Sequence, residues 1–399
     1  MENAVALCAV GAEKVVSNEL RKMGIKVEES LYGRVRFKTD VKGLYQALIN
    51  LRAADRVLLE TAHFKATDFD ALFEGAASAA WEQIVPKGMG LKVAKVRTNR
   101  SQLKAETTIQ AMVHKAAAQR LCSKYKMNRL PEPKVTPKGE DTVKVAEVRV
   151  YIEKDMVSLL LDLSGDPLFK RGYRSEGGAA PLRETTAASI LLLSGWKRKF
   201  PIYDPFCGSG TILIEAAMYA WDMSPGLGRH FAIEDMLIAD TKTEQAVRDE
   251  FRSKIDFSRL VRIAGSDEEL RSVSIAASNA ARLRDIAEGR LPQRGIRSTD
   301  SKAFGFDIKA LPMSQAVSPY SDSGYIVTNP PYGKRLGDQT MAEGIYKEMA
   351  GLQQRFPGWK LAVITDHSGF ESFYGKKADS CREISNGAIP SYFFQFDIQ

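Results

Sequence analysis

Residues 325–335, Tyr-Ile-Val-Thr-Asn-Pro-Pro-Tyr-Gly-Lys-Arg, join an apolar run to a polar, proline-rich end. The exocyclic amine of a purine is a weak nucleophile because its lone pair is delocalised into the ring. An enzyme that alkylates it must hold its hydrogens and orient the lone pair. The side-chain oxygen of Asn329 and the carbonyl of Pro330 can accept those hydrogens, and Pro330 and Pro331 fix the backbone direction. We expect Tyr332 to stack on an extruded base. The alternative is a rigid proline loop after a strand.

Residues 202–211, Ile-Tyr-Asp-Pro-Phe-Cys-Gly-Ser-Gly-Thr, precede an apolar helical pattern at 212–221. The pattern predicts a strand that ends at Asp204, a turn containing Gly208 and Gly210, and then a helix. In open α/β sheets ligands bind beyond the carboxyl ends of strands, where glycines let a ligand approach the backbone. We therefore expect a cofactor at this turn. We interpret Cys207 as a small space-filling residue, because amine alkylation needs no covalent enzyme intermediate.

Two further acidic residues follow predicted strands. A strand at 261–265 leads into Ser266 and Asp267, where a carboxylate can accept both hydroxyls of a ribose. The alternative role for Asp267 is that of a helix N-cap. Asp307, in Phe-Gly-Phe-Asp, is our candidate for the adenine amino group of the same cofactor.

The elements that must position these residues alternate short apolar strands with helices from about residue 180 onward. This alternation predicts a doubly wound, mostly parallel sheet. Residues 222–254 are expected to be an insertion or an extended helix. Near the other end of the chain, a strand at 5–10, a helix at 12–23 and a hairpin around Gly33 predict a small α+β module.

The middle of the chain has its own pattern. It predicts a helix at 69–84, a strand at 91–97, a helix at 107–124, and two strands at 143–152 and 156–163 that turn at 153–155. Before these two strands, Pro131, Pro133, Pro137 and Gly139 interrupt regular structure.

Positive charge is concentrated in this middle part. The net charge of the chain is +8, yet residues 87–138 contain thirteen Lys and Arg against Glu106 and Glu132, a local balance of +11. A polyanion is the natural partner, because contacts with phosphates release condensed counterions. The alternative is a solvated basic surface. The cations that we expect to bind such a polyanion are Lys95, Arg97, Arg100, Lys104, Lys124, Lys126 and Arg129.

Other classes of protein fit the sequence poorly. The first residues lack a basic segment followed by an apolar stretch, and no run of about 18 apolar residues occurs, so we expect a cytoplasmic protein without a membrane partner. Cys8, Cys122, Cys207 and Cys381 are widely separated. We therefore expect neither disulfides nor a metal site.

The segments DPFCGSGT (204–211) and NPPYGKR (329–335) together resemble the amino-methyltransferases of the class I, Rossmann-like superfamily. The closer resemblance is to the THUMP-domain RNA methyltransferases, whose bacterial members include ribosomal RNA guanine-N2 methyltransferases once described as DNA methylases. Segments 171–174 (RGYR), 180–185 (APLRET) and 356–359 (FPGW) are similar to that family as well. The resemblance covers nearly the whole chain.

This resemblance implies a fold, a cofactor and a substrate. The implied fold is a ferredoxin-like domain at 1–64, a THUMP domain at 65–165 and a Rossmann-like methyltransferase domain at 166–399, with an antiparallel hairpin at the C-terminal end of its sheet. The cofactor would be S-adenosylmethionine, and the partner would be RNA, with guanine N2 of 23S ribosomal RNA or of a ribosome assembly intermediate as target. The implied cofactor contacts are Asp204, Phe206, Gly208, Gly210, Thr211, Asp267, Asp307 and, near the methionine end, Thr185. The implied catalytic residues are Asn329, Pro330, Pro331 and Tyr332.

Three alternatives stay open at this point. The chemistry suits adenine N6 of DNA or RNA as well as guanine N2, and the amide of a protein glutamine is a similarly delocalised nitrogen. A non-enzymatic RNA-binding module is the third alternative, and it would predict a decayed cofactor site. Guanine is preferred over adenine on family likeness alone. The sequence does not determine the target nucleotide, the number of methyl groups added or the oligomeric state.

Overall fold

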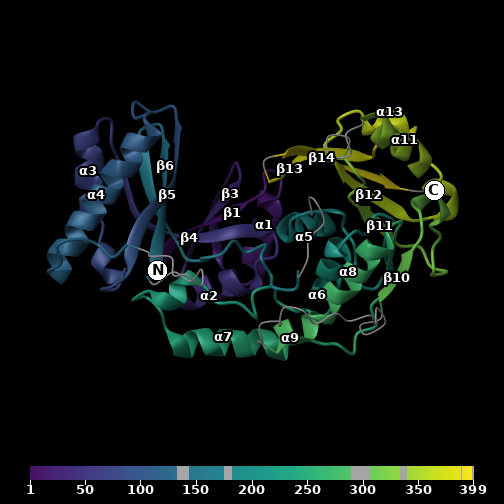
Figure 1. Ribbon diagram of the computed structural model, residues 1–399, viewed down its shortest axis with the longest axis horizontal. Helices are drawn as coiled ribbons and strands as arrows, with labels where there is room; N and C mark the ends of the chain where they lie inside the picture. Colours follow the sequence, from purple (N-terminus) through teal and green to yellow (C-terminus); the bar gives the residue numbers. More distant parts are fainter. Residues whose placement is uncertain (133–142, 175–181, 289–305, 333–338, 388, 398–399) are drawn as a thin grey trace.

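Two seven-stranded sheets lie side by side in the computed structural model (Figure 1). The structure describes residues 1–132, 143–174, 182–288, 306–332, 339–387 and 389–397. The predicted interruption at Pro133, Pro137 and Gly139 lies outside the described residues, as do residues 180–181 and 333–335 of the family-like segments. The first sheet has the order β2-β3-β1-β4-β7-β6-β5, and the second has the order β10-β9-β8-β11-β12-β14-β13.

One edge of the first sheet is built by the first 65 residues. Its elements are β1 (Glu2–Cys8), α1 (Glu13–Lys22), β2 (Lys26–Leu31), β3 (Arg34–Thr39), α2 (Val41–Asn50) and β4 (Ala54–Lys65). All four strands pair antiparallel, in the order β2-β3-β1-β4. The predicted strand, helix and hairpin at Gly33 are confirmed within a few residues, and α2 and β4 are added to them. This βαββαβ arrangement confirms the expected ferredoxin-like domain.

The rest of the first sheet continues without a break from β4. Its elements are α3 (Phe69–Ser78), η1 (Trp81–Gln83), β5 (Gly90–Asn99), α4 (Glu106–Tyr125), β6 (Val145–Glu153) and β7 (Met156–Asp162). The twelve-residue strand β4 pairs with β1 near its start and with β7 as far as its last residue, Lys65. Helices α3 and α4 lie against each other at the far left of Figure 1. The domain boundary that we predicted at 64 and 65 therefore falls within β4.

The prediction of one helix over residues 69–84 is wrong. Helix α3 ends at Ser78, and the chain is extended at Ala79 before the short turn η1. Trp81 is fully buried, and its indole N–H donates to the carbonyl of Ala76 at 2.8 Å. Burying this large side chain turns the backbone out of the helical path.

The second sheet confirms the predicted doubly wound architecture. Its strands are β8 (Ile202–Asp204), β9 (Ile263–Asp267), β10 (Phe306–Ala310), β11 (Tyr325–Thr328), β12 (Lys360–Thr365), β13 (Ser380–Asn386) and β14 (Ile389–Asp397). The first five in spatial order are parallel, and β14 pairs antiparallel with β12 and β13. The helices of this half are α5 (Glu184–Leu193), α6 (Thr211–Ala220), α8 (Leu270–Ala281), α9 (Leu283–Ala287), η4 (Met313–Gln315), α11 (Gln339–Met349), α12 (Leu352–Arg355) and α13 (Phe370–Tyr374). Strand β8 lies between β9 and β11, so the ends of these three strands meet at one edge.

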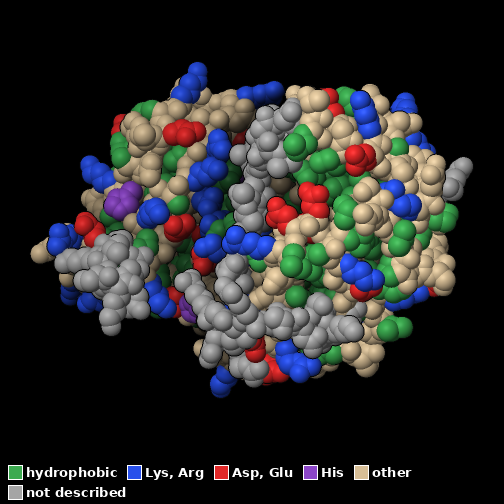
Figure 2. Space-filling view, turned by 45° about the vertical axis from the view of Figure 1, so that its right-hand side comes forward, with side chains coloured by type: hydrophobic (Ala, Val, Ile, Leu, Met, Phe, Trp, Pro, Cys, Tyr) green, Lys and Arg blue, Asp and Glu red, His purple; other side chains and the backbone are tan. Residues whose placement is uncertain are grey.

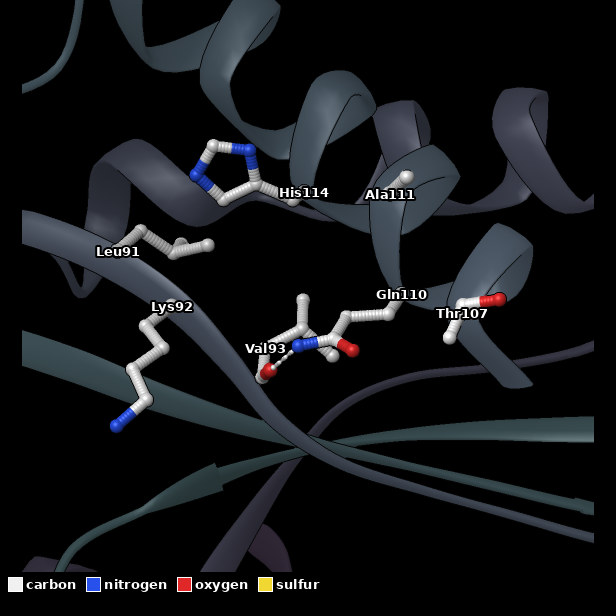
Figure 3. Close-up of a pocket in the computed structure, with 7 residues that line it drawn as sticks. All are labelled: Leu91, Lys92, Val93, Thr107, Gln110, Ala111 and His114. Atoms are coloured by element: carbon white, nitrogen blue, oxygen red, sulfur yellow. Dashed lines mark hydrogen bonds between the residues drawn. The ribbon is translucent and has the colours of Figure 1, made fainter.

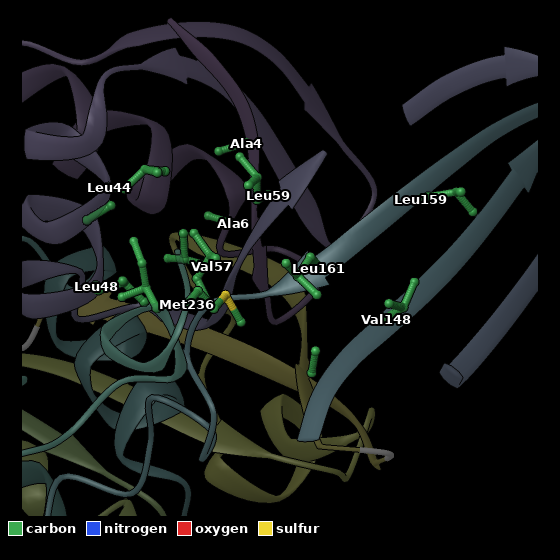
Figure 4. Packing of buried hydrophobic residues seen from close by; sticks show 14 of the residues in the cluster. Ala4, Ala6, Leu44, Leu48, Val57, Leu59, Val148, Leu159, Leu161 and Met236 are labelled. Atoms are coloured by element: carbon green, nitrogen blue, oxygen red, sulfur yellow. The ribbon is translucent and has the colours of Figure 1, made fainter. Parts of the chain in front are cut away.

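Residues 222–254 do not extend helix α6, which ends at Ala220. They contain the short turn η2 (Ala232–Asp235) and the helix α7 (Thr241–Ser253). Six of their buried apolar side chains join the core of the first sheet, whereas Met223 joins that of the second. The six are Leu227, Phe231, Ile233, Met236, Val247 and Phe251. Figure 4 shows Met236 among Leu48 of α2 and Val57 of β4. The insertion therefore joins the two halves of the molecule.

None of the helices in the described ranges is long and apolar enough to cross a membrane.

Candidate cofactor and methyl-transfer site

The glycine turn after β8 leaves room for a ligand. Both Gly208 and Gly210 have positive φ, +50° and +80°, a region that residues with a side chain rarely adopt. A Cβ on Gly210 would lie 2.9 Å from the Cβ of Ala276, so this glycine lets α8 pack against the turn. A Cβ on Gly208 would meet nothing within 4 Å, so this residue borders open space. Cys207, directly before Gly208, is buried, and burial raises the pKa of its thiol, as expected for a space-filling residue.

Asp267 is the last residue of β9 and connects this strand to the glycine turn. Its Oδ2 accepts from the backbone N–H of Gly208 at 2.9 Å, and its Oδ1 accepts from the N–H of Glu269 at 3.0 Å. The residue that caps α8 is Glu269, so the alternative reading of Asp267 as the helix N-cap is wrong. Asp267 stays partly exposed beside the turn. Its carboxylate has lone pairs left for ribose hydroxyls.

Asp204 ties the glycine turn to the proline-rich motif. Its side chain is 1% exposed, and its Oδ1 accepts from the Thr328 hydroxyl at 2.6 Å and from the Phe206 N–H at 3.1 Å. Thr328 ends β11 and directly precedes Asn329. Burial raises the pKa of Asp204 to about 7, against hydrogen bonds that lower it. Asp204 thus fixes the two motifs relative to each other.

Replacing Asp204 by Asn should change how stability depends on pH. Because the carboxyl pKa is about 7 in the folded protein and near 3.8 when unfolded, the stabilising contribution of Asp204 is complete below pH 3.8 and is lost as the pH rises through 7. Since a pKa change of one corresponds to about 1.4 kcal/mol, the loss is roughly 4 kcal/mol. Thermal unfolding measured from pH 4 to 8 should show that the stability of the variant relative to the wild type increases as the pH rises. A stability difference that does not change with pH would contradict the proposed effect of burial on the pKa of Asp204.

Asn329 and Tyr332 lie in contact. The Tyr332 hydroxyl donates to Asn329 Oδ1 at 2.6 Å, and the Tyr346 hydroxyl donates to the Pro331 carbonyl at 3.2 Å. Tyr332 is 6% exposed, and burial raises the pKa of its phenol. The structure thus brings Asn329, the expected hydrogen-bond acceptor, and Tyr332, the expected stacking residue, together. The Tyr332 hydroxyl is hydrogen-bonded to the Asn329 oxygen that we expect to accept from the base amine.

Two predicted cofactor residues have other contacts in the structure. The Thr185 hydroxyl donates to Asp55 Oδ1 at 2.5 Å, which joins α5 to the start of β4 in the first sheet. Asp307 lies opposite Ala264 on β9, whereas Asp267 lies opposite Ala310. Asp307 therefore lies three residues, about 10 Å along the parallel strands, on the N-terminal side of the position opposite Asp267. Its carboxylate is 3.1 Å from Lys309 Nζ.

Phe206 and Thr211 lie on either side of the glycine turn. Phe206 packs partly buried against the aromatic cluster of the second sheet. Thr211 begins α6, is 5% exposed and accepts from Arg174 Nη2 at 3.0 Å. Our sequence reasoning assigned no role to Thr328 or Arg174. Thr328 could have been noticed because it directly precedes Asn329, and Arg174 because it ends the family-like segment RGYR.

The seven predicted RNA-binding residues are all exposed, and none forms an ion pair with another residue that the structure describes. They form two groups rather than one. Lys95, Arg97, Arg100 and Lys104 lie on β5 and in the loop before α4, whereas Lys124, Lys126 and Arg129 lie at its C-terminal end. The twenty residues of α4 separate the groups by about 30 Å.

A cavity of about 330 Å³ lies between β5 and α4 in the same basic segment (Figure 3). The Gln110 amide N–H donates to the carbonyl of Val93 at 2.6 Å across it. The cavity is lined by Leu91, Lys92, Val93, Thr107, Gln110, Ala111 and His114. None of the seven predicted RNA-binding residues lines it.

Among the residues described, no cluster of His, Cys, Asp and Glu could hold a metal ion. The open space at Gly208 and the carboxylate of Asp267 suit a nucleoside ligand. A Rossmann-like sheet with this turn after β8, its third strand in spatial order, is typical of S-adenosylmethionine-dependent methyltransferases.

The comparisons with known proteins place the chain within this class. Residues 171–393 match the family described as the RMKL-like methyltransferase domain, and residues 3–58 match the RlmL ferredoxin-like domain. The chain belongs to the RMKL-like methyltransferase family.

Relatives of known sequence or structure span nearly the whole chain. A Bacillus subtilis (strain 168) protein named "Putative RNA methyltransferase YpsC" is 33% identical over 98% of this chain and 95% of its own length. The crystal structure of a possible methylase from Clostridium difficile 630 has a TM-score of 0.86 and 33% identity, covering 100% of this chain and 98% of that one. SMU.472, described as a putative methyltransferase and crystallised with S-adenosylhomocysteine (SAH), has a TM-score of 0.83 and 32% identity over 100% and 98% of the two chains. The cofactor of this protein is therefore S-adenosylmethionine.

Proposed function

We propose that this protein methylates an exocyclic base amine in structured RNA, with guanine N2 of 23S ribosomal RNA or of its assembly intermediate as the target. The observation that carries the proposal is the placement of Asn329 at the end of β11, anchored through Thr328 to Asp204 beside the glycine turn. The name of the Bacillus subtilis relative supports RNA as the substrate class.

In the proposed reaction the chain itself supplies orientation. When bound, S-adenosylmethionine supplies a methyl group activated by its sulfonium. Asn329 Oδ1 and the Pro330 carbonyl accept the two hydrogens of the base amine and direct its lone pair. Since Tyr332 already donates to Asn329 Oδ1, the base amine takes the place of the phenol there, and the freed ring can stack on the base. The amine becomes positive as it attacks and loses its proton afterwards, so no strong base is required.

RNA recognition is assigned to residues 65–165 as a THUMP domain. A-form grooves hide sequence information, so the module would bind the backbone and shape of a folded RNA while an unpaired base enters the catalytic pocket. In Figure 2, Lys and Arg side chains gather along the middle of the face beside a hollow, with Asp and Glu side chains on its other side. The seven predicted cations form no ion pair within the described part of the chain, which leaves them free to contact phosphates and supports this assignment.

Reversing the charge of Lys124 and Lys126 to Glu should weaken RNA binding by about tenfold and reduce the slope of log affinity against log salt by about two, because two phosphate contacts are lost. SAH affinity should not change. Filter binding at several salt concentrations measures the first effect, and calorimetry measures the second. Lys14 and Lys22, exposed on α1, provide the matched charge-reversal control. Unchanged RNA affinity would favour the solvated basic surface.

The target atom is tested by nucleoside mass spectrometry. RNA from cells that lack the protein should lose N2-methylguanosine at one site, and purified enzyme with labelled S-adenosylmethionine should restore it. Label in N6-methyladenosine, in DNA or in protein glutamine would instead identify one of the alternative substrates. No label in any of them would overturn the proposed function.

A further inference from the structure

Arg174 holds a fixed position at the start of helix α6. Its Nε donates to Glu184 Oε1 at 2.9 Å. Its Nη2 donates to the carbonyl of Leu182 at 2.9 Å and to the hydroxyl of Thr211 at 3.0 Å. These bonds connect the first residues of α5 with the first residue of α6. The guanidinium therefore lies directly behind the glycine turn.

One nitrogen of this guanidinium has no partner among the residues that the structure describes. Nη1 of Arg174 is buried and forms no hydrogen bond with any of them, whereas Nε and Nη2 are fully used. An arginine carries five N–H donors, of which two are on Nη1. A buried cationic donor without an acceptor is costly, so such a group is expected where a ligand completes its hydrogen bonding.

The surroundings specify the ligand chemistry. Thr211 lies 3.3 Å from the Ser209 hydroxyl within the turn, and Gly208 borders open space. Three acids, Asp204, Glu184 and Asp267, lie around the turn, and Glu184 is paired with Arg174. The amino-acid end of S-adenosylmethionine carries a carboxylate, which can bind among these acids only beside a cation. Asp267 on the β9 side is the candidate for the ribose, which leaves the start of α6 for the amino-acid end.

We propose that Arg174 binds the carboxylate of the amino-acid end of the cofactor through Nη1. Guanidinium–carboxylate contacts are among the stronger hydrogen bonds in proteins. Thr185, which we expected near this end of the cofactor, is engaged with Asp55 instead. The inference concerns cofactor binding and does not depend on which nucleotide is methylated.

Truncated ligands test the proposal by calorimetry on the full chain. SAH has the whole amino-acid end. Decarboxylated S-adenosylmethionine lacks the carboxylate but keeps the ammonium and the sulfonium, and 5′-methylthioadenosine has neither a carboxylate nor an ammonium. Arg174→Gln should weaken SAH binding by on the order of 10- to 100-fold and leave the affinity for the other two ligands unchanged. Arg174→Lys keeps the charge and should recover part of the loss.

A control variant separates the loss of a cofactor contact from the general destabilisation caused by replacing a buried arginine. Arg248 is also buried and pairs with Glu244 and Glu234, far from the turn in the chain. Arg248→Gln should leave binding of all three ligands unchanged. The proposal is overturned if Arg174→Gln weakens SAH and 5′-methylthioadenosine by the same factor, or if it leaves SAH binding intact.

Discussion

Asn329→Ala should reduce methyl transfer by on the order of 10²- to 10³-fold, while SAH affinity stays within a few-fold of the wild type. The substitution removes the side-chain oxygen that holds a hydrogen of the base amine. It leaves the glycine turn, Asp267 and the Thr328–Asp204 bond in place. Single-turnover transfer from labelled S-adenosylmethionine to RNA measures the first quantity, and calorimetry measures the second.

Tyr332→Phe is the matched control for this prediction. It keeps the ring for stacking and removes the phenol hydroxyl, and with it the bond to Asn329. Transfer by this variant should stay within about tenfold of the wild type, because the amine, not the phenol, must occupy the acceptor. Substantial turnover by Asn329→Ala would contradict the catalytic assignment of Asn329.

Asp267→Ala should weaken SAH binding by on the order of 100-fold, because hydrogen bonds to a charged group contribute about 1.5–3 kcal/mol each and a ribose offers two hydroxyls. The backbone N–H groups of Gly208 and Glu269 also lose their acceptor, so the turn loses its fixed shape. At saturating cofactor the transfer rate should fall far less than the affinity. Titration of SAH and a comparison of KM with kcat would show this division.

Asp267→Asn separates these two contributions. The amide oxygen can still accept from one backbone N–H, whereas the charge that strengthens both ribose contacts is gone. Its SAH affinity should lie between those of the wild type and Asp267→Ala. If Asp267→Ala bound SAH as tightly as the wild type, Asp267 would be a purely structural residue.

The centre of the site could be predicted because its signals are local. The glycine turn and the Asn-Pro-Pro-Tyr motif each follow a short apolar strand. Neighbouring parallel strands end at the same edge, so two motifs 120 residues apart meet once β8 and β11 pair. The same reasoning located Asp267 at the end of β9.

Register and long-range partners could not be predicted in this way. Asp307 lies on the expected strand, but the pairing of β10 with β9 places it three residues before the ligand edge. Thr185 has a distant partner, Asp55, which no local pattern shows. The helix expected at 69–84 ends early because Trp81 is required in the core, and tertiary burial overrides helical periodicity.

The way in which residues 222–254 join the two halves of the molecule could not be predicted from local sequence patterns either. Residues 222–254 have the periodicity of an ordinary amphipathic segment, which does not indicate the sheet on which it packs. The structure places Phe231, Ile233 and Phe251 in the core of the first sheet. The continuous strand β4 was missed for a related reason, since its two halves pair with β1 and β7, strands far apart in sequence.

The position of Phe231, Ile233 and Phe251 has a consequence for the integrity of the chain. A fragment that starts at residue 166 would carry these apolar side chains into water, and a fragment that stops at 165 would be left with a cavity where they belong. Neither piece has a complete interior. Synthesis interrupted between the halves, or cleavage there by a protease, would therefore yield two aggregation-prone remnants rather than an RNA-binding protein and a methyltransferase.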